Sequence, residues 1–423
     1  MTRTRRPHVW LVEISEFIPT VDDGHRPLRS GRLALALEAA GCSVHWWSST
    51  FSHQLKRQRF PSSRTIDIGR GVATRLLWGP GYNRNRSLAR LQHNRAIAAS
   101  FKREAPAELE RHRPDIVVAH FPTVEVTSAS VAFASANGIP VLVDVQDQHP
   151  DFILAQLPAP LRLAARLALH GMRRQVQALC RRATGITGVS QENVGWGAAL
   201  AGRPVGPADA FFPHGYPAHA TAGGHDAARI AALNIPPGDF VVAFAGSFAR
   251  SFDLRTILDA ARIIESRGVH DMRLVLAGDG VQRSDILSLA SDLPSVVAPG
   301  WLDGPTVVRL LELSHVGLAP YARNARITLS NKPFEYMAAS LPIVHTLEGE
   351  LDTLVRDEGL GARYRADDPL ALADILLGLH RDRATAAEMG KRGRALFERA
   401  FTAERVYPRF AEHVIAVAAT NRR

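Results

Sequence analysis

Residues 329–342, LSNKPFEYMAASLP, combine a helix start with two charged side chains that could bind a phosphorylated ligand. Ser330 or Asn331 can cap the first amides, and apolar residues follow at helical spacing: Phe334, Met337, Ala338 and Leu341. The free N–H groups and the helix dipole favour an anion, beside which Lys332 places a full positive charge. Glu335, one turn later, could accept hydrogen bonds from hydroxyl groups. Phosphate and sugar hydroxyls together describe a nucleotide sugar; a capped surface helix with a solvated lysine and glutamate is the alternative.

Short apolar strands alternate with helical stretches along the first half of the chain. HVWLVEI, CSVHWWSS, DIVVAHF, IPVLVDVQD and ATGITGVS have the composition of buried strands. Between them lie helical patterns, including RLALALEAAG and one long helix over residues 161–182. This alternation predicts an α/β fold with a parallel sheet.

A stretch rich in Pro, Gly and Ala, residues 204–238, is the best linker candidate. After it the alternation restarts with the strands FVVAFAGS, MRLVLAGDG, SVVAPGWL, VGLAPY and PIVHT. We expect one Rossmann-like domain over residues 1–220, a second over residues 221–402, and a C-terminal segment, 403–423, that is helical from Pro408 onward. Ligands of such sheets bind beyond the C-terminal ends of the strands, so two facing domains would offer a cleft.

The positive charge of the chain lies in its first quarter. Residues 1–113 hold 20 Lys and Arg against 9 Asp and Glu, whereas residues 114–220 hold 7 against 7. The basic and aromatic residues interleaved there are Trp46, Trp47, Lys56, Arg57, Arg59, Trp78, Tyr82, Arg84, Arg86, Arg90 and Arg95. Such a surface could meet anionic phospholipid or nucleic acid, or be a solvated basic face. Because no nucleic-acid-binding motif accompanies it, we expect no nucleic-acid partner.

Cysteine use and hydropathy favour a cytoplasmic protein. Cys42 and Cys180 lie far apart, which argues against a disulfide framework or a zinc cluster. The basic N-terminal residues lack the apolar region of a signal peptide, and no stretch approaches the about 20 apolar residues of a membrane-spanning helix. We expect a protein that is soluble or peripheral on the inner face of the cell membrane. The histidines are scattered and the pair Asp22 and Asp23 follows no apolar strand, so no metal site is predicted.

An ordered set of motifs in the second half carries a family resemblance. FAGSFARSFDLRTILDAA, LVLAGDG, VVAPGWL, VGLAPY, NKPFEYMAASLPIV and MGKRGRALFERAFTAERV resemble, in this order, the retaining GT-B glycosyltransferases of family 4. That family includes bacterial enzymes of capsule and O-antigen assembly. Weaker similarities to the family in the first half are WWSSTFSHQLKRQRF, DIVVAHFP, DVQDQHPD, TGVSQEN and FFPHGYP, the last with His214 where the family usually has asparagine. The resemblance implies a C-terminal helix that crosses back to the first domain.

The resemblance also implies a donor site in the second domain. Glu335 matches the family glutamate that contacts the nucleotide ribose, whereas Ile327 stands where an earlier glutamate is usual, so backbone amides at 328–331 are the candidate substitutes. Arg250 and Lys332 are the candidates to neutralise the departing diphosphate, in place of a metal. The remaining candidate donor contacts are Gly246, Ser247, Gly278, Asp279, Gly280, Ser330 and Asn331. A solvated loop arginine and a tight turn at 278–280 are the alternatives.

In the first domain, His120 closes the strand DIVVAHF, where retaining members with a histidine use it close to the reacting sugar. Imidazole has a suitable pKa for hydrogen bonding or proton transfer there. Asp147 and His149 follow the next strand and could bind an acceptor or serve structure alone. Gly31 and Arg29 resemble the first loop, which nears the donor phosphates; a loop without function is the alternative.

Together with the resemblance, these residues predict a metal-independent glycosyltransferase of the hexosyl type. We expect it to move a sugar, with retention, from a nucleotide-diphosphate donor to a saccharide or polyprenyl-linked saccharide in cell-surface polysaccharide synthesis. No cofactor is expected. A sugar-nucleotide epimerase of the same architecture, and a non-catalytic member that binds a nucleotide sugar within an assembly complex, are the alternatives.

Overall fold

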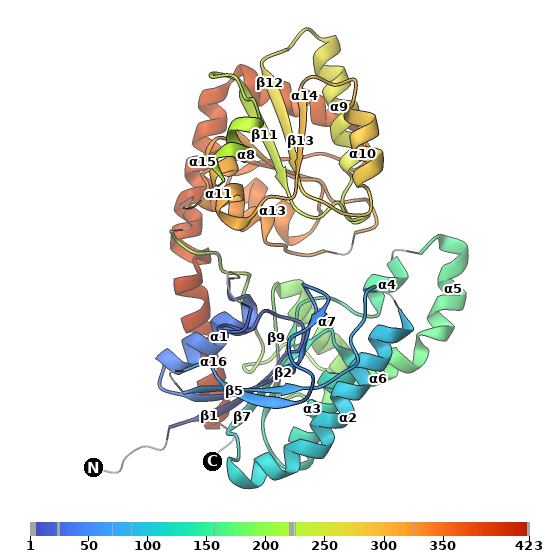
Figure 1. The fold of residues 1–423 in the computed structure, drawn as a ribbon, viewed down its shortest axis with the longest axis vertical. Helices are drawn as coiled ribbons and strands as arrows, with labels where there is room; N and C mark the ends of the chain where they lie inside the picture. Colours follow the sequence, from blue (N-terminus) through green and yellow to red (C-terminus); the bar gives the residue numbers. More distant parts are fainter. Residues whose placement is uncertain are drawn as a thin grey trace. The chain divides into compact units, whose positions relative to one another are not determined.

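The computed structural model of the protein describes residues 6–22, 26–69, 71–85, 87–155, 157–219, 224, 226–325 and 327–420. The chain divides into two compact units: unit 1 comprises residues 1–215 and 404–423, and unit 2 comprises residues 216–403. The boundary at Gly215 and Tyr216 falls within the stretch 204–238. Each unit is an α/β structure built on one main sheet (Figure 1).

Unit 1 is built on an eight-stranded sheet in the order β10-β9-β8-β7-β1-β2-β6-β5. Neighbouring strands are parallel except β5 and β6, which are antiparallel. The strands of unit 1 are β1 (His8–Val12), β2 (Ser43–Ser49), β3 (Phe51–Ser52), β4 (Arg57–Gln58), β5 (Arg64–Asp67), β6 (Val72–Leu77), β7 (Ile116–Phe121), β8 (Val141–Val145), β9 (Gly185–Gly188) and β10 (Ala210–Phe211). β3 and β4 form a separate two-stranded antiparallel sheet. Its helices are α1 (Arg29–Ala39), α2 (Leu88–Arg111), α3 (Val124–Ala136), α4 (Asp151–Ala155), α5 (Ala159–Ala168), α6 (His170–Arg182), α7 (Gln191–Ala201) and α16 (Ala403–Thr420).

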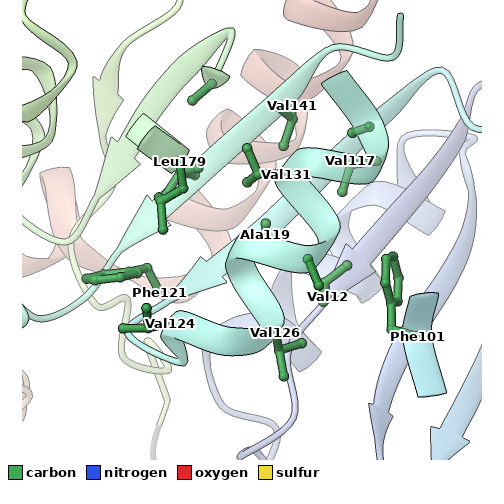
Figure 2. Packing of buried hydrophobic residues seen from close by; sticks show 14 of the residues in the cluster. Val12, Phe101, Val117, Ala119, Phe121, Val124, Val126, Val131, Val141 and Leu179 are labelled. Atoms are coloured by element: carbon green, nitrogen blue, oxygen red, sulfur yellow. The ribbon is translucent and has the colours of Figure 1, made fainter. Parts of the chain in front are cut away.

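The core of unit 1 lies where α3 packs on the central strands. Figure 2 shows Val117 and Ala119 of β7 beneath Val124, Val126 and Val131 of α3. All five side chains are buried, and β7 is buried along its whole length. Parallel strands covered on both faces read as continuous apolar runs, which is why DIVVAHF was recognisable as a strand.

Unit 2 is built on a six-stranded parallel sheet in the order β13-β12-β11-β14-β15-β16. Its strands are β11 (Phe240–Ala245), β12 (Met272–Ala277), β13 (Val296–Gly300), β14 (Val316–Ala319), β15 (Ile343–His345) and β16 (Gly361–Arg363). Its helices are α8 (Ala227–Ala232), α9 (Leu254–Ser266), α10 (Arg283–Ala290), α11 (Gly304–Glu312), α12 (Lys332–Ala338), α13 (Glu350–Asp357), α14 (Pro369–Arg381), α15 (Arg383–Leu396) and the π-helical turn η1 (Phe397–Phe401).

The structure differs from the sequence prediction at two helices. The single helix predicted over residues 161–182 is two helices, α5 and α6, separated at Leu169. The C-terminal helix α16 begins at Ala403, before Pro408, which lies inside it. Leu169 has ψ of 2°, which turns the chain, although the amphipathic pattern continues through the turn and gives no sign of it.

α16 packs within unit 1, although it is separated from the rest of that unit by all of unit 2. Phe410 stacks on Phe212, with ring centroids 4.4 Å apart and an interplanar angle of 11°. The guanidinium of Arg29 lies 5.1 Å from the centroid of the Phe410 ring, and that of Arg32 lies 5.9 Å from the Tyr407 ring. Aromatic stacking and cation–π contacts therefore hold α16 beside α1.

Candidate functional site

A buried histidine–carboxylate pair lies at the carboxyl ends of β7 and β8. His120 and Asp144 are register partners on these parallel strands, and Thr187 of β9 is the partner of Asp144 on the other side. His120 Nδ1 lies 3.1 Å from Asp144 Oδ2, and the Thr187 hydroxyl donates to Asp144 Oδ1 at 2.9 Å. Because all three residues occupy the same row of the sheet, the strand register itself assembles the cluster.

Arg29, at the start of α1, is bound to this cluster from the adjacent helix. Its Nε and Nη2 donate to the two oxygens of Asp144 at 2.7 and 2.8 Å, and Nη1 donates to the carbonyl of Phe212 at 2.7 Å. The side chains of Arg29 and Asp144 are 2% and 0% exposed. The sequence analysis expected Arg29 near the donor phosphates. In the structure its guanidinium is instead bound within the protein, by the two oxygens of Asp144 and the carbonyl of Phe212.

Glu16 occupies the amino end of α1. Its carboxylate accepts from the backbone N–H of Ser30 at 2.8 Å, from the Ser30 hydroxyl at 2.9 Å, and from the N–H of Gly31 at 3.3 Å. The Ser30 hydroxyl also lies 3.2 Å from His120 Nε2. A hydrogen-bonded chain therefore runs from Glu16 through Ser30 to His120 and on to Asp144.

The ionisable groups in this hydrogen-bonded series shift one another's pKa values. Burial and the charge of Glu13 raise the pKa of Glu16 to about 7, which its bonds to Ser30 and the charge of His120 only partly oppose. Burial lowers the pKa of His120, but Asp144 and the glutamates outweigh burial, so the net shift is upward. Burial likewise opposes ionisation of Asp144, yet Arg29 and His120 hold its pKa well below the usual range. The surroundings of His120 therefore favour the protonated imidazole.

Asp147 and His149 lie in the loop between β8 and α4. Asp147 is exposed, and its carbonyl accepts from the N–H of His149 at 3.0 Å. The His149 ring stacks on Phe152 at 5.6 Å between centroids, and the peptide bond from His149 to Pro150 is cis.

In unit 2, the ammonium of Lys332 points into the protein. Lys332 is 8% exposed, and its Nζ donates to the carbonyl of Ala245, the last residue of β11. The ammonium lies 4.4 Å from the Phe244 ring centroid and 5.0 Å from that of Phe252. Burial lowers the pKa of Lys332 to about 8, against a smaller upward effect of Glu335. The lysine thus carries a titratable charge at the carboxyl end of a central strand.

Two tyrosines, Tyr321 just after β14 and Tyr336 on α12, anchor the segment that carries this lysine. The Tyr336 hydroxyl donates to the carbonyl of Leu318 at 2.6 Å, and its ring lies so close to Gly317 that a Cβ there would overlap it. The Tyr321 hydroxyl bonds to the Ser330 hydroxyl, which also accepts from the N–H of Lys332 at 3.3 Å. Asn331 occupies the N-cap position without a side-chain hydrogen bond, so Ser330 is the residue that meets an amide of α12.

Ile327, which stands where the family usually has a glutamate, packs in the apolar core of unit 2. Ile327 is half-buried and packs against the apolar cluster that contains Leu329 and Phe334. Glu335 is half-buried on α12 and has polar or electrostatic interactions of its own. Ile327 therefore contributes apolar packing at the position where the family usually has a glutamate. Glu335 lies in the first turn of α12, as the sequence predicted.

Two loops beyond β11 and β12 are bonded to each other. Phe248 N donates to the carbonyl of Asp279 at 2.8 Å, and Gln282 Nε2 donates to that of Ala249 at 2.7 Å. A Cβ at Gly278 would overlap the carbonyl oxygen of Gly246, so glycine is required for this approach. Ser247, Arg250, Asp279 and Gly280 are exposed on the two loops.

Each cluster lies at the switch point of its own sheet. In unit 1 the strand order reverses at β1, between β7 and β2, and His120 is the next-to-last residue of β7. In unit 2 the order reverses between β11 and β14, where Lys332 meets Ala245 and Tyr321 follows β14. Ligands of open parallel sheets bind beyond the strand ends at such points. The predicted residues His120 and Lys332 therefore occupy the positions where each sheet favours binding.

Sequence reasoning missed the partners of these residues: Glu13, Glu16, Ser30, Asp144, Phe244, Phe252 and Tyr321. Asp144 gave a usable signal, because a carboxylate inside the apolar run VLVDV must find a buried cation. Glu16 gave none, since its ligands are backbone amides of a helix that begins 13 residues later along the chain, at Arg29.

The surface predicted over residues 1–113 is wrong for most of its aromatic residues, whereas several of its arginines are exposed. Trp46, Trp47 and Tyr82 are buried, and only Trp78 of these aromatic residues is exposed, at 42%. Arg59 is buried in an ion pair with Asp22, at 2.6 Å. Arg84 and Arg95 are exposed as predicted. Arg86 and Asp23 lie outside the described residues.

The part of the chain that the structure describes contains neither a membrane-spanning helix nor a metal-binding cluster. None of its helices is long and apolar enough to cross a membrane. Within the same part of the chain, no group of three or more His, Cys, Asp and Glu residues is arranged to hold a metal ion. Cys42 and Cys180 are both buried free thiols.

The comparisons with known proteins agree with this geometry. Residues 239–382, most of unit 2, match the family described as glycosyl transferases group 1. No curated protein matches the sequence. Among solved structures, sucrose-phosphate synthase from Thermosynechococcus elongatus has a TM-score of 0.73 at 18% identity, over 98% of this chain and 100% of that one.

Two further structures match over nearly their whole length. HepE from Anabaena, solved in complex with UDP-glucose, has a TM-score of 0.62 at 14% identity and covers 97% of this chain and 99% of its own. WaaG, a glycosyltransferase involved in lipopolysaccharide biosynthesis, has a TM-score of 0.63 at 13% identity and covers 96% and 99%. The predicted fold is confirmed: the chain is an α/β protein with the GT-B fold.

Proposed function

We propose that the protein is a sugar-nucleotide-dependent glycosyltransferase of the hexosyl type. In this proposal unit 2 binds a nucleotide-diphosphate sugar and unit 1 binds the acceptor, a saccharide or a polyprenyl-linked saccharide. Transfer proceeds with retention, in the cytoplasm, as a step of cell-surface polysaccharide synthesis. The family match of residues 239–382 and the UDP-glucose complex of HepE support the donor class, and the stated role of WaaG supports the pathway.

The observation that carries the proposal is the position of Lys332. Cleaving a sugar–diphosphate bond leaves negative charge on the diphosphate, which a preorganised cation in a low-dielectric site stabilises strongly. Lys332 holds its ammonium at the switch point of the unit 2 sheet, bonded only to the Ala245 carbonyl among the described hydrogen bonds. A diphosphate can replace that neutral acceptor with a charge-assisted bond. Arg250, exposed on the loop after β11, supplies a second cation.

The other predicted residues complete the assignment. Glu335 accepts from the ribose hydroxyls, and the glycines at 246, 278 and 280 let backbone approach the nucleotide. Ser247, Asp279, Ser330 and Asn331 line the same strand ends as further donor contacts. His120 serves the transferred sugar or the acceptor, with Asp144 and Glu16 fixing its charge. Neutralisation of the diphosphate by lysine and arginine makes the chemistry metal-independent, and no cofactor takes part.

Turnover with defined substrates tests the class. The purified protein is incubated with a panel of UDP-, GDP- and dTDP-sugars, with and without polyprenyl-diphosphate-linked saccharides, and free nucleotide and products are measured. Acceptor-dependent release of nucleotide diphosphate is expected, with retained anomeric configuration by NMR. Product without acceptor would instead identify an epimerase, and donor binding without turnover in any combination would identify a binding protein. Lys332→Ala should abolish turnover, whereas Lys391→Ala, on an exposed ion pair of unit 2, should not.

A further inference from the structure

An exposed apolar helix lies on unit 1, away from the residues assigned above. Leu161, Leu163 and Leu167 of α5 are 55%, 69% and 74% exposed. α5 projects from unit 1 beyond α6 (Figure 1), and of its described side chains only Ala165 is even half-buried. None of the residues of α4, which precedes it, is fully buried. Single exposed apolar residues are common on protein surfaces, but three large ones on one short helix indicate an interaction site.

The same segment carries a one-sided charge. Between Asp151 and Glu192 the sequence contains six arginines and no lysine, aspartate or glutamate. These are Arg162, Arg166, Arg173, Arg174, Arg181 and Arg182, all exposed. Among the described residues, only Arg173 of this set forms an ion pair, with Asp151 at 2.9 Å. The balanced charge of residues 114–220 thus conceals a strongly basic segment.

The leucines and arginines of α5 occupy adjoining faces. Leu163 and Leu167 are four residues apart, which places them one above the other on the helix, and Arg162 and Arg166 form a parallel row beside them. A helix with an apolar row next to a basic row is suited to lie in the plane of a bilayer, with its apolar side chains at the boundary between headgroups and acyl chains.

We propose that α5, with the arginines of α6, docks on an anionic lipid bilayer. Leu163 and Leu167 enter the headgroup region, and the arginines bind lipid phosphates. Charge favours lipid over another copy of this chain, because pairing two such faces would bring their arginines together without a carboxylate between them. A bilayer accepts the leucines and neutralises the arginines at the same time. The inference does not depend on the proposed catalytic activity.

Vesicle binding by the full-length protein tests this surface. Sedimentation is measured with vesicles of phosphatidylcholine alone, and of phosphatidylcholine and phosphatidylglycerol in equal parts, at low and high NaCl. The wild type should bind the anionic vesicles, and the binding should weaken with salt. Arg166→Gln/Arg174→Gln should lose roughly fivefold in affinity for each arginine. Leu163→Ser/Leu167→Ser should lose on the order of tenfold or more.

Matched controls use exposed residues elsewhere. Leu88→Ser, at 78% exposure on α2, and Arg84→Gln/Arg95→Gln alter the surface predicted from residues 1–113 and should leave vesicle binding unchanged. All variants should keep the wild-type Tm, since the replaced side chains are exposed. Four results would overturn the proposal: no binding to anionic vesicles, equal binding to neutral ones, wild-type binding by the α5 variants, or lipid-free self-association that those variants abolish.

Discussion

His120 and Asp144 face each other from neighbouring parallel strands, with Nδ1 and Oδ2 3.1 Å apart and both side chains almost fully buried. The carboxylate also receives two bonds from Arg29 and one from Thr187. Asp144 is therefore a positioning residue. It orients the imidazole of His120 and favours its protonated form, while Asp144 itself is fully buried.

Asp144→Asn should reduce the free energy of unfolding at pH 7 by about 3–5 kcal/mol, because it leaves Arg29 buried without its counter-charge. The stabilisation by this carboxylate, whose folded pKa is depressed, is present above the unfolded pKa and disappears in acid. The pKa of His120 should fall in the variant, since Asp144 is the main group that raises it. Urea denaturation and an NMR titration of His120 measure the two effects.

The control for that experiment is Asp209→Asn, which removes the ion pair with Arg203 elsewhere in unit 1. It should reduce stability without moving the titration of His120. If both variants left the His120 titration unchanged, Asp144 would have a purely structural role.

Glu16→Gln should change the pH dependence of stability. The folded pKa of Glu16, about 7, lies above its usual value of 4.5, so the wild type loses stability as pH rises from 4.5 to 7, by about 3 kcal/mol. Glutamine does not ionise and avoids this loss. The difference in unfolding free energy between variant and wild type should therefore shift in favour of the variant over that interval. Urea denaturation at pH 4.5 and pH 7.5 checks it; a constant difference would mean that Glu16 titrates normally.

Nucleotide affinity should follow the charge of Lys332. Its pKa of about 8 means that the ammonium is charged at pH 7 and largely neutral at pH 9.5. We expect UDP to bind more weakly at the higher pH, by roughly tenfold, the value of one charged hydrogen bond. Lys332→Ala should bind UDP weakly at both pH values, and Lys391→Ala should behave like the wild type. Calorimetric titration measures all three; equal pH dependence in Lys332→Ala would assign the titration to another group.

Gly278→Ala should destabilise the loops at the donor end of unit 2. The added Cβ would meet the carbonyl of Gly246, and separating the two loops should cost about 1–3 kcal/mol. Gly304→Ala, at the first position of α11, has open space around the new Cβ and a backbone that alanine accepts, so it should be close to neutral. Denaturant unfolding of the two variants compares them, and equal stability would contradict the close approach of the loops.

Local sequence signals predicted the elements, whereas contacts across the fold decided where side chains point. α12 was predictable because Pro333 and a row of apolar residues mark its start and its buried face. The inward direction of the Lys332 ammonium was not, because its partner is the carbonyl of Ala245, 87 residues earlier in the chain. Periodicity shows that a residue is on a helix, but not which distant backbone atom it reaches.

The tryptophans of β2 illustrate the same limit. Trp46 and Trp47 point to opposite faces of the sheet, and a strand with one solvated face would expose one of them. β2 is instead an interior strand between β1 and β6, and both rings are buried. Their burial, and with it the failure of the predicted aromatic surface, follows from the strand order, which the sequence of β2 does not contain.

The return of α16 to unit 1 has a consequence for biosynthesis. Phe212 and Arg29 are made early, but their contacts with Phe410 form only after α16 has left the ribosome. Unit 2 is continuous in sequence and can fold while unit 1 still lacks a helix. The half of the molecule that is translated first is therefore the half that is finished last, and its apolar surface beside α1 stays open to chaperones until then.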